Sequence, residues 1–472
     1  MKPLSLFSCR SGAAACALGA ALCGCADVAM APYQRPDAPS KAAFSAREAA
    51  PVSASDTIRP DWWKEFRDPY LDRLVAQAIE GNIDLRILAA RSRVAQAQIG
   101  EARAGALPTL DAGAGASFEK VTGQKFSQTF SLGTQVNWDI DVWGKFEKGV
   151  QAQEAGFQAS EADWRAGYLS MVADVSSAYF QILQLDEQSA RQQQALERGR
   201  QILATYEAMH AVGLLPTTRV LQQRAEINRL TSDLLELRRA RDLAANALAT
   251  LLGRPAGEIT VPPGRLQQTV QLPPVPAGLP AQLLERRPDI VAAEYRVLEA
   301  YNLVGQARLA QLPSISLTAR GGSASFALTD LLKTFTLGLS PSINLPMFDP
   351  GIKARIKTSE AQTKVAEEQY RRTVIGAFEE VENALVNLDA HRRQRAELAQ
   401  QVSQLEVVAQ QFAGQLREGV VSQLDVFEAE RSLLSAQLAL LANHQQLLSD
   451  TVTLYKAMGG GWPAVQVGAA QH

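Results

Sequence analysis

The chain has 472 residues, with 47 Lys and Arg against 49 Asp and Glu and a net charge of -2. This balance argues against a nucleic-acid-binding surface as the main role of the protein. No stretch approaches the roughly 20 apolar residues of a spanning helix, which excludes a multi-span helical membrane protein. All four cysteines precede residue 26, so neither a disulfide framework nor a cysteine-based zinc site is expected in the body of the chain.

Residues 1–24 have the features of a lipoprotein signal peptide. Lys2 and Arg10 supply a positive n-region, and the apolar run that follows is too short to span a membrane. The run ends in Leu22-Cys23-Gly24-Cys25, which resembles a bacterial lipobox. We expect cleavage before Cys25, whose thiol then carries lipid, with palmitate-like chains anchoring the protein at about 0.8 kcal/mol per methylene. An ordinary cleaved signal with a chance cysteine is the alternative.

The residue after Cys25 is Ala26 rather than Asp. By resemblance to bacterial lipoprotein sorting, this favours the outer membrane. Residues 25–60 are rich in Pro, Ala and Ser without periodicity, which predicts an extended N-terminal linker.

The body of the chain contains an internal repeat. Eight of the 27 positions in 84–110 are identical to those in 289–315, at an offset of 205. At an offset of 206, Gly213 matches Gly419 and Gly253 matches Gly459. We therefore expect two structural repeats, at 61–258 and 281–461. The Pro-rich connector 259–280 separates them, and 462–472 forms a C-terminal tail.

Each repeat is expected to contain two long strands, within about 109–142 and about 314–346. From Phe130 to Val142, apolar residues alternate with small or polar ones. Strands of this length with one apolar face are typical of a transmembrane barrel, although alternation alone also permits a soluble sandwich with one wet face. Four strands cannot close a barrel, and open edges are not tolerated in lipid. If the strands lie in a membrane, several chains must therefore build one barrel.

Each pair of strands is followed by a very long helix, at about 145–212 and 352–418. Some 65 residues make a rod of about 100 Å. Heptad spacing of apolar residues, as in Leu398, Val402, Leu405 and Ala409, predicts coiled-coil packing. Each long helix ends in a short turn and a returning helix, which gives two helical hairpins with small apolar tips near 213 and 419.

At this point the chain resembles the outer-membrane efflux channels of the TolC type, in their lipoprotein (OprM/NodT-like) branch. The motifs that carry the resemblance are specific in combination: Trp62-Trp63 with Phe66 and Asp68-Pro69, Trp138-Asp139-Ile140-Asp141-Val142-Trp143-Gly144, Leu284-Glu285-Arg286-Arg287-Pro288-Asp289-Ile290, Leu345-Pro346-Met347-Phe348-Asp349, and Leu454-Tyr455-Lys456-Ala457-Met458-Gly459-Gly460-Gly461-Trp462.

The resemblance implies a mixed α and β membrane protein. Four strands per chain build a twelve-stranded barrel in a homotrimer, which continues into a coiled-coil α-helical barrel in the periplasm. It also implies passive export of small toxic compounds, as in multidrug resistance. The channel docks to a periplasmic adaptor (membrane fusion) protein and an inner-membrane pump of the RND type.

Little in the sequence indicates chemistry, so no enzyme activity and no cofactor are expected. The four histidines lack metal-ligand spacing, and no phosphate-binding loop precedes a helix. Asp139 and Asp141 stand at i and i+2, and polarity facing a lumen explains them better than a catalytic carboxylate pair. Two other functions stay open, a lipid-anchored periplasmic coiled-coil adaptor and a TolC-like channel for protein secretion.

The resemblance places a periplasmic gate at Leu424, Asp425, Glu428 and Arg431. Asp425 and Glu428 stand at i and i+3, so both acids are expected on one helix face, and threefold repetition would make rings of carboxylates. The alternative is a plain helix N-terminus, where acids are favoured by the macrodipole.

Three further expectations concern the hairpin tips. Gly213 and Leu214 in the first tip, and Gly419 and Val420 in the second, are expected to meet the adaptor. Where many relatives carry an acid, this chain has Arg219. The repeat offset places Arg219 level with Asp425, so we interpret Arg219 as a possible latch that faces Asp425 or Glu428 of a neighbouring hairpin.

Overall fold

The computed structural model describes residues 32–37, 59–120, 122–123, 126–273 and 287–460. They belong to two compact units. The first combines segment 32–37 with Arg91–Glu161 and Ala292–Arg372, and the second combines the described parts of Pro39–Ala90, Ala162–Val291 and Thr373–His472. The signal peptide, Cys25, most of the N-terminal linker, residues 274–280 of the connector and the C-terminal tail lie outside the described residues.

Both repeats contain a helix, two strands, a very long helix and a returning helix in that order, as the sequence predicts. The first contains η2 (Trp62–Phe66), α2 (Pro69–Gly81), α3 (Ile83–Ala104), β1 (Thr109–Glu119), β2 (Ser127–Ile140), α4 (Lys145–Ala211) and α5 (Thr217–Leu251), and the short α6 (Leu266–Thr269) follows in the connector. The second contains α7 (Pro288–Leu309), β3 (Ser314–Ser325), η4 (Leu328–Asp330), β4 (Thr336–Asn344), α8 (Pro350–Arg417) and α9 (Gln423–Ala457). Because α3 and α7 each have 22 residues, and α5 and α9 each have 35, the repeat extends to the lengths of the elements.

Among the described residues, no helix combines the length and the apolar character needed to cross a membrane.

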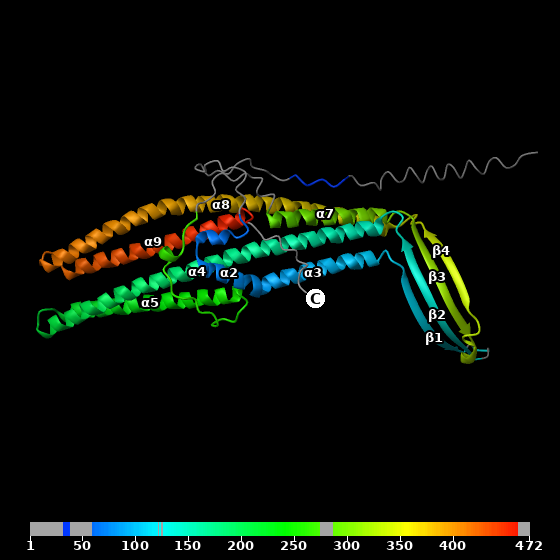
Figure 1. The fold of residues 1–472 in the computed structure, drawn as a ribbon, viewed down its shortest axis with the longest axis horizontal. Helices are drawn as coiled ribbons and strands as arrows, with labels where there is room; N and C mark the ends of the chain where they lie inside the picture. Colours follow the sequence, from blue (N-terminus) through cyan, green and yellow to red (C-terminus); the bar gives the residue numbers. More distant parts are fainter. Residues whose placement is uncertain (1–31, 38–58, 121, 124–125, 274–286, 461–472) are drawn as a thin grey trace, which may run out of the picture. The chain divides into compact units, whose positions relative to one another are not determined.

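The four strands form one antiparallel sheet in the order β1-β2-β3-β4 (Figure 1). The pleat gives the sheet two different faces. One face carries large apolar side chains, and several are almost fully exposed in the single chain, such as Leu110 at 71% and Leu337 at 83%. The other face carries Ser, Thr, Asn, Gln, Gly and a few charged residues. The long, two-faced strands predicted from the sequence are therefore confirmed.

Aromatic side chains border the apolar face at both ends of the strands. Trp138 and Trp143, at the ends of the strands nearest the helices, each donate an indole hydrogen bond to a backbone carbonyl, of 3.0 and 2.8 Å. Near the opposite turn, Phe118 packs against Phe126 and Phe130 with ring centroids 6.3 and 6.1 Å apart. Two aromatic girdles that flank an apolar band are the pattern of a strand that crosses an outer membrane.

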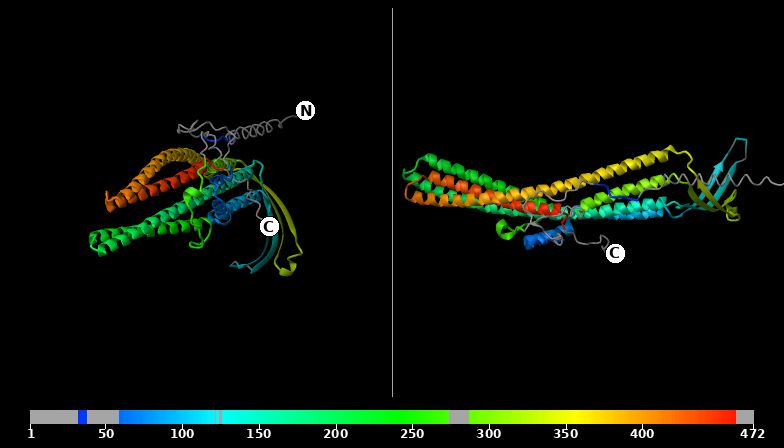
Figure 2. Two further views of the ribbon diagram at one scale, coloured as in Figure 1. Left: turned by 60° about the vertical axis from the view of Figure 1, so that its left-hand side comes forward. Right: turned by 90° about the horizontal axis from the view of Figure 1, so that it is seen from above.

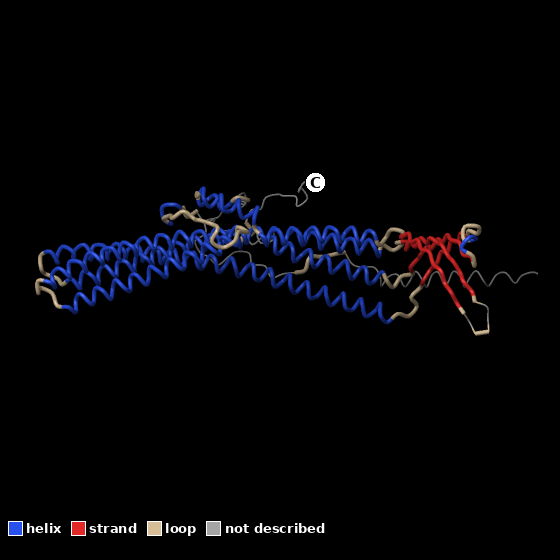
Figure 3. Tube along the Cα trace, turned by 90° about the horizontal axis from the view of Figure 1, so that it is seen from below, coloured by secondary structure: helices blue, strands red, loops and turns tan. Residues whose placement is uncertain are grey.

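After each long helix the chain turns and a second helix returns antiparallel to the first, so that α4 and α5 form one hairpin and α8 and α9 form the other (Figures 1 and 2). The tips are short loops between helices, whereas the strands gather in the single sheet (Figure 3). At 67 and 68 residues, α4 and α8 are each about 100 Å long, as the sequence predicts.

Residues of the Trp62-Trp63 motif form part of the core of the second unit. Trp62 is fully buried and stacks on Tyr455 at a centroid distance of 5.3 Å, while the Tyr455 hydroxyl donates to Glu65 at 2.7 Å. The Asp68 carboxylate caps α2 through the Tyr70 N–H at 2.8 Å. These motif residues join the start of the first repeat to the end of the second.

The two repeats also share one junction, at the base of each returning helix. In the first, the Asn82 side-chain amide donates to the carbonyl of Leu251 at 2.8 Å. In the second, the Arg287 guanidinium donates to the carbonyl of Ala457 at 2.8 Å. Asn82 and Arg287 correspond at the repeat offset of 205, and both bond the last residue of the returning helix. Arg287 is also paired with Asp289 and Glu380, at 2.6 and 2.8 Å.

Candidate functional site

The two hairpin tips have the same backbone geometry. In the first, Gly213 has φ of 78°, and the N–H groups of Gly213 and Leu214 donate to His210 and Met209. In the second, Gly419 has φ of 74°, and the N–H groups of Gly419 and Val420 donate to Leu416 and Gln415. Both are Schellman motifs, which require a left-handed residue after the helix, and glycine adopts that conformation without steric cost.

The tips expose small and apolar side chains. Leu214 is 71% exposed and Val420 is 69% exposed, and a Cβ built on Gly213 or Gly419 would meet no atom within 4 Å. The glycines are therefore required by backbone conformation and not by close packing. In the described chain, the four tip residues therefore form two small apolar ends that are exposed and can contact another molecule.

The second returning helix begins with a complete capping box. The backbone N–H and the Oγ of Ser422 both donate to Oδ2 of Asp425, at 2.8 and 2.6 Å, and the Asp425 N–H donates back to Oγ at 3.4 Å. The hydrogen bond from the Ser422 side chain, followed by that from its backbone, lowers the pKa of Asp425. Asp425 is thus ionised and its carboxylate is turned back toward the tip.

The other three residues of the predicted gate form a stripe along α9. Leu424, Glu428 and Arg431 are all exposed and are spaced i, i+4 and i+7, which places them on one helix face. Val426 and Ala429, between them, are buried against the neighbouring helices. The structure therefore groups Leu424, Glu428 and Arg431, while the Asp425 carboxylate has a local partner.

The first returning helix begins differently. Its N-cap residue is Pro216, which provides no side-chain cap. Arg219 stands at the third position of α5, as Asp425 does in α9, and its guanidinium contacts Gln222 at 3.5 Å. Burial raises the pKa of Tyr206 on α4, and the Arg219 charge opposes that shift. Within the single described chain, Arg219 forms no ion pair with Asp425 or Glu428.

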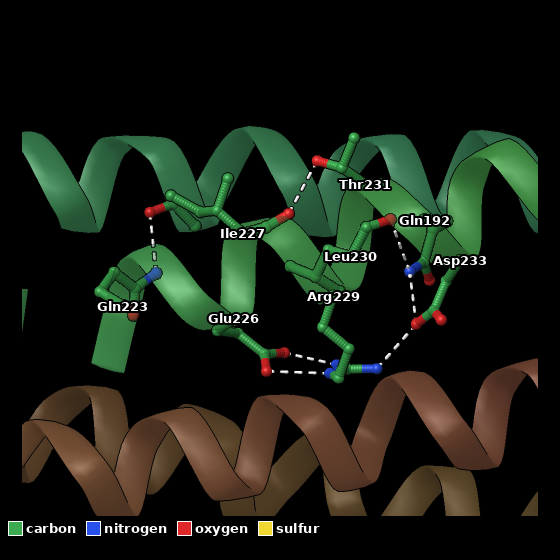
Figure 4. Close-up of polar contacts among 9 residues, drawn as sticks. Gln192, Gln223, Glu226, Ile227, Arg229, Leu230, Thr231 and Asp233 are labelled. Carbon is green, nitrogen blue, oxygen red and sulfur yellow. Dashed lines mark hydrogen bonds and ion pairs between the residues drawn. The ribbon is translucent and has the colours of Figure 1, made fainter. Parts of the chain in front are cut away.

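A polar network that the sequence analysis did not single out lies between α4 and α5 (Figure 4). The Arg229 guanidinium chelates Glu226 and also donates to Asp233 at 2.7 Å. Gln192 of α4 reaches both the Leu230 carbonyl and Asp233, at 3.3 and 3.4 Å. The sequence contained a signal for the ion pairs of this network. Glu226 precedes Arg229 by three residues and Asp233 follows it by four, which are the spacings of ion pairs along a helix.

The two hairpins are joined at the level of the gate stripe, through a residue on another side of α9. Arg198 of α4 pairs with Glu430 of α9 at 3.7 Å. Beside this ion pair, Leu434 of α9 packs on a cluster of Leu196, Leu230 and Leu234. Arg198 and Glu430 are 232 positions apart in the sequence, so only the tertiary structure identifies them as partners.

The two aspartates at the end of β2 have different surroundings. Asp139 lies on the polar face of β2, whereas Asp141 accepts the N–H groups of Phe146 and Glu147 at 2.9 and 3.1 Å and caps α4. Asp141 therefore has a structural role as a helix cap, which the sequence analysis did not predict. No group of three or more His, Cys, Asp or Glu suited to a metal ion occurs among the described residues. Cys25, the expected lipid attachment site, lies outside them.

Comparison with known proteins gives one consistent answer. The family model described as "Outer membrane efflux protein" matches residues 74–254 and 279–460. The chain is 31% identical to the probable outer membrane lipoprotein SilC of Salmonella typhimurium over 455 residues, covering 93% of this chain and 96% of SilC. It is 32% identical to the pyoverdine export outer membrane protein OpmQ of Pseudomonas aeruginosa over 436 residues, covering 90% and 92%. Its fold matches the outer-membrane channel OprN with a TM-score of 0.82 at 29% identity, covering 92% and 99%.

Proposed function

Since the chain belongs to the outer membrane efflux protein family, we propose that it forms a passive duct for small toxic compounds, docked to a periplasmic adaptor and an RND-type inner-membrane pump. The protein is an outer-membrane channel of a tripartite efflux system in the bacterial outer membrane, and it is not an enzyme. The sequence-based assignments of family, fold and localisation are therefore confirmed. The alternative of a periplasmic adaptor is set aside, because this chain matches outer-membrane proteins over most of their length.

The observation that carries the proposal is the open sheet. It presents an apolar face, yet β1 and β4 are edge strands with no partner in the described chain. Unpaired strand edges are not tolerated in lipid, so the sheet must be completed by other chains. Three copies give twelve strands, a number compatible with the even-stranded barrels of outer membranes. A homotrimer is accordingly part of the proposal.

The gate belongs to the same proposal. Leu424, Glu428 and Arg431 form the exposed stripe of α9, and three copies would line a narrow end with alternating charge. Oδ2 of Asp425 is occupied by Ser422, which leaves Oδ1 for a neighbouring cation. Arg219 stands at the matching position of the other hairpin, so a pair between neighbouring chains would act as a latch.

Anchoring is proposed at Cys25, since the relative SilC is described as a lipoprotein. Cys25→Ala should abolish metabolic labelling with a fatty acid, and labelling that persisted would refute the assignment. Export should survive this change, because a closed barrel holds itself in the membrane.

Two experiments test the function as a whole. A strain without this protein should become hypersensitive to a subset of small toxic compounds, and the wild-type chain should restore tolerance. The purified chain should migrate as a heat-modifiable trimer and conduct ions across a planar bilayer. A monomer that never conducts would overturn the proposal and return the lipid-anchored structural protein as the better explanation.

A further inference from the structure

A single row of side chains crosses the polar face of the sheet at mid-height. The strand register places Asp111 opposite Gln135, Gln135 opposite Arg320, and Arg320 opposite Gly338. Directly opposed residues in antiparallel strands point to the same face. Asp111, Gln135 and Arg320 therefore share one face, which is opposite to the face of Leu110, Val136 and Leu339.

The apolar face is the one that suits lipid, so Arg320 must point into the lumen of the completed barrel. Arg320 is the seventh of the twelve residues of β3, about 20 Å along the strand from Ser314. An arginine on the lipid face at this depth would be strongly destabilising, whereas on the lumen face it is solvated.

The surroundings of Arg320 leave its charge uncompensated and accessible. The side chain is exposed, and in the described part of the chain it forms no hydrogen bond or ion pair. The residue opposite it on β4 is Gly338, where an added Cβ would meet no atom within 4 Å. A hollow of about 670 Å³ lies over this part of the sheet, lined among others by Asp111, Gln135, Arg320 and Gly338. Room for a solute therefore exists beside the guanidinium.

The charges on the polar face give Arg320 a distinct position. Over the four described strands, this face carries the acids Asp111, Glu119 and Asp139, and Arg320 is its only base. Acids therefore outnumber bases on this face of the described strands, and Arg320 is the one side chain there that attracts anions. Asp111 lies two strands away, about 10 Å at the usual strand spacing, and is not paired with Arg320.

We propose that Arg320 sets the ion selectivity of the barrel. In the threefold channel it forms a ring of three guanidinium groups that lets small anionic solutes, carboxylates in particular, pass an otherwise acidic lumen. The ring rests on the proposed trimer. A guanidinium binds carboxylates in a bidentate manner, and a ring of like charges around a lumen raises the local concentration of counter-ions.

The test is the reversal potential of purified trimers in a planar bilayer under a KCl gradient at low salt, where screening is weakest. Arg320→Gln should lower the ratio of anion to cation permeability by about threefold or more, because the trimer loses three unit charges and each is worth roughly a factor of two at about 10 Å in water. Arg320→Lys keeps the charge and should keep the ratio. Asp111→Asn removes an acid from the same row and should move the ratio in the opposite direction.

Lys333→Gln is the matched control. Lys333 lies beyond the strands and is paired with Asp330, so its removal should leave the reversal potential unchanged. Heat-modifiable migration checks that every variant still assembles. If the wild type conducts and Arg320→Gln has the wild-type reversal potential, the selectivity ring is wrong while the channel stands. If the wild type assembles no conducting channel, it is the proposed function that fails.

Discussion

The two helical hairpins of this chain share a backbone plan and differ in the side chains that use it. Each ends in a Schellman motif closed by a glycine, Gly213 or Gly419, and each returns through a 35-residue helix. The first returning helix starts at Pro216 without a side-chain cap, whereas the second starts with the capping box of Ser422 and Asp425. Repetition has preserved what the main chain needs, and the side chains at equivalent positions have diverged.

The same contrast recurs at the base of the hairpins. The neutral side-chain amide of Asn82 donates to the carbonyl of the last residue of α5. The buried guanidinium of Arg287 donates to the carbonyl of the last residue of α9 and also pairs with two carboxylates. The second hairpin therefore depends on charge at both of its ends, while the first depends on neutral groups. The gate residues expected from the family resemblance lie in this second hairpin.

Substitution of the tip glycines should have the largest effect. Gly419→Asp places a hydrated charge where the exposed apolar tip must pack, and we expect it to abolish export while the trimer remains. Gly414→Asp is the control, because Gly414 lies in α8 with open space around it and no left-handed φ. Compound tolerance in a complemented deletion strain measures the outcome. Normal export by Gly419→Asp would place docking elsewhere, and loss in Gly213→Asp as well would show that both tips are needed.

Removing the side chains that bond the last residue of each returning helix should destabilise the second repeat more than the first. Arg287 is only 7% exposed, and Arg287→Ala removes its hydrogen bonds to two carboxylates and a helix end; because Asp289 and Glu380 are themselves 37% and 54% exposed, we expect a loss of about 2–3 kcal/mol. Asn82→Ala removes two neutral hydrogen bonds and should cost about 1–2 kcal/mol. The thermal midpoint of trimer dissociation compares them, with the exposed Arg254→Ala as control. Equal losses would contradict the view that charge matters more in the second hairpin.

Charge reversal tests whether the hairpins meet across chains. Arg219→Glu should raise ion leakage through purified channels, and Asp425→Arg alone should do the same. The double reversal should restore closure if the two are partners. An exposed pair is worth only about 0.2–1 kcal/mol, so each of the three pairs should change the ratio of open to closed channels by no more than about fivefold. Wild-type conductance of Arg219→Glu at low salt would eliminate the latch.

Exchanging the caps should have the smallest effect. Ser422→Ala removes the capping box of α9 and should destabilise its first turn by about 1 kcal/mol, whereas Pro216→Ser offers α5 a cap that it lacks and should stabilise it by less than that. Amide hydrogen exchange in the first turns of α5 and α9 reports both changes. Faster exchange in α9 without any change in α5 would mean that Pro216 already fixes the entry of the first helix.

The sequence by itself determined the architecture, because periodicity records which face of each element is buried or meets lipid. The alternation after Phe130 predicted the strands, the heptads after Leu398 predicted the coiled-coil rods, and the repeat match of Gly213 with Gly419 predicted two equivalent hairpin tips. The structure explains that match, because a Schellman motif needs a left-handed residue and glycine adopts this conformation without strain.

Only the tertiary structure decided which side chains are partners. Arg198 and Glu430 lie 232 positions apart in the sequence. Arg287 and the carbonyl of Ala457 are likewise joined by no local pattern. Contacts between helices depend on how the helices pack and not on spacing within one helix. The role of Asp141 as a helix cap is local, since its carboxylate bonds residues five and six positions later, but it depends on the conformation of the turn after β2 that brings the carboxylate to the start of α4. The row that contains Arg320 likewise required the register of four strands drawn from both repeats, because the sequence gives each strand a polar face but does not say which residues of different strands lie side by side.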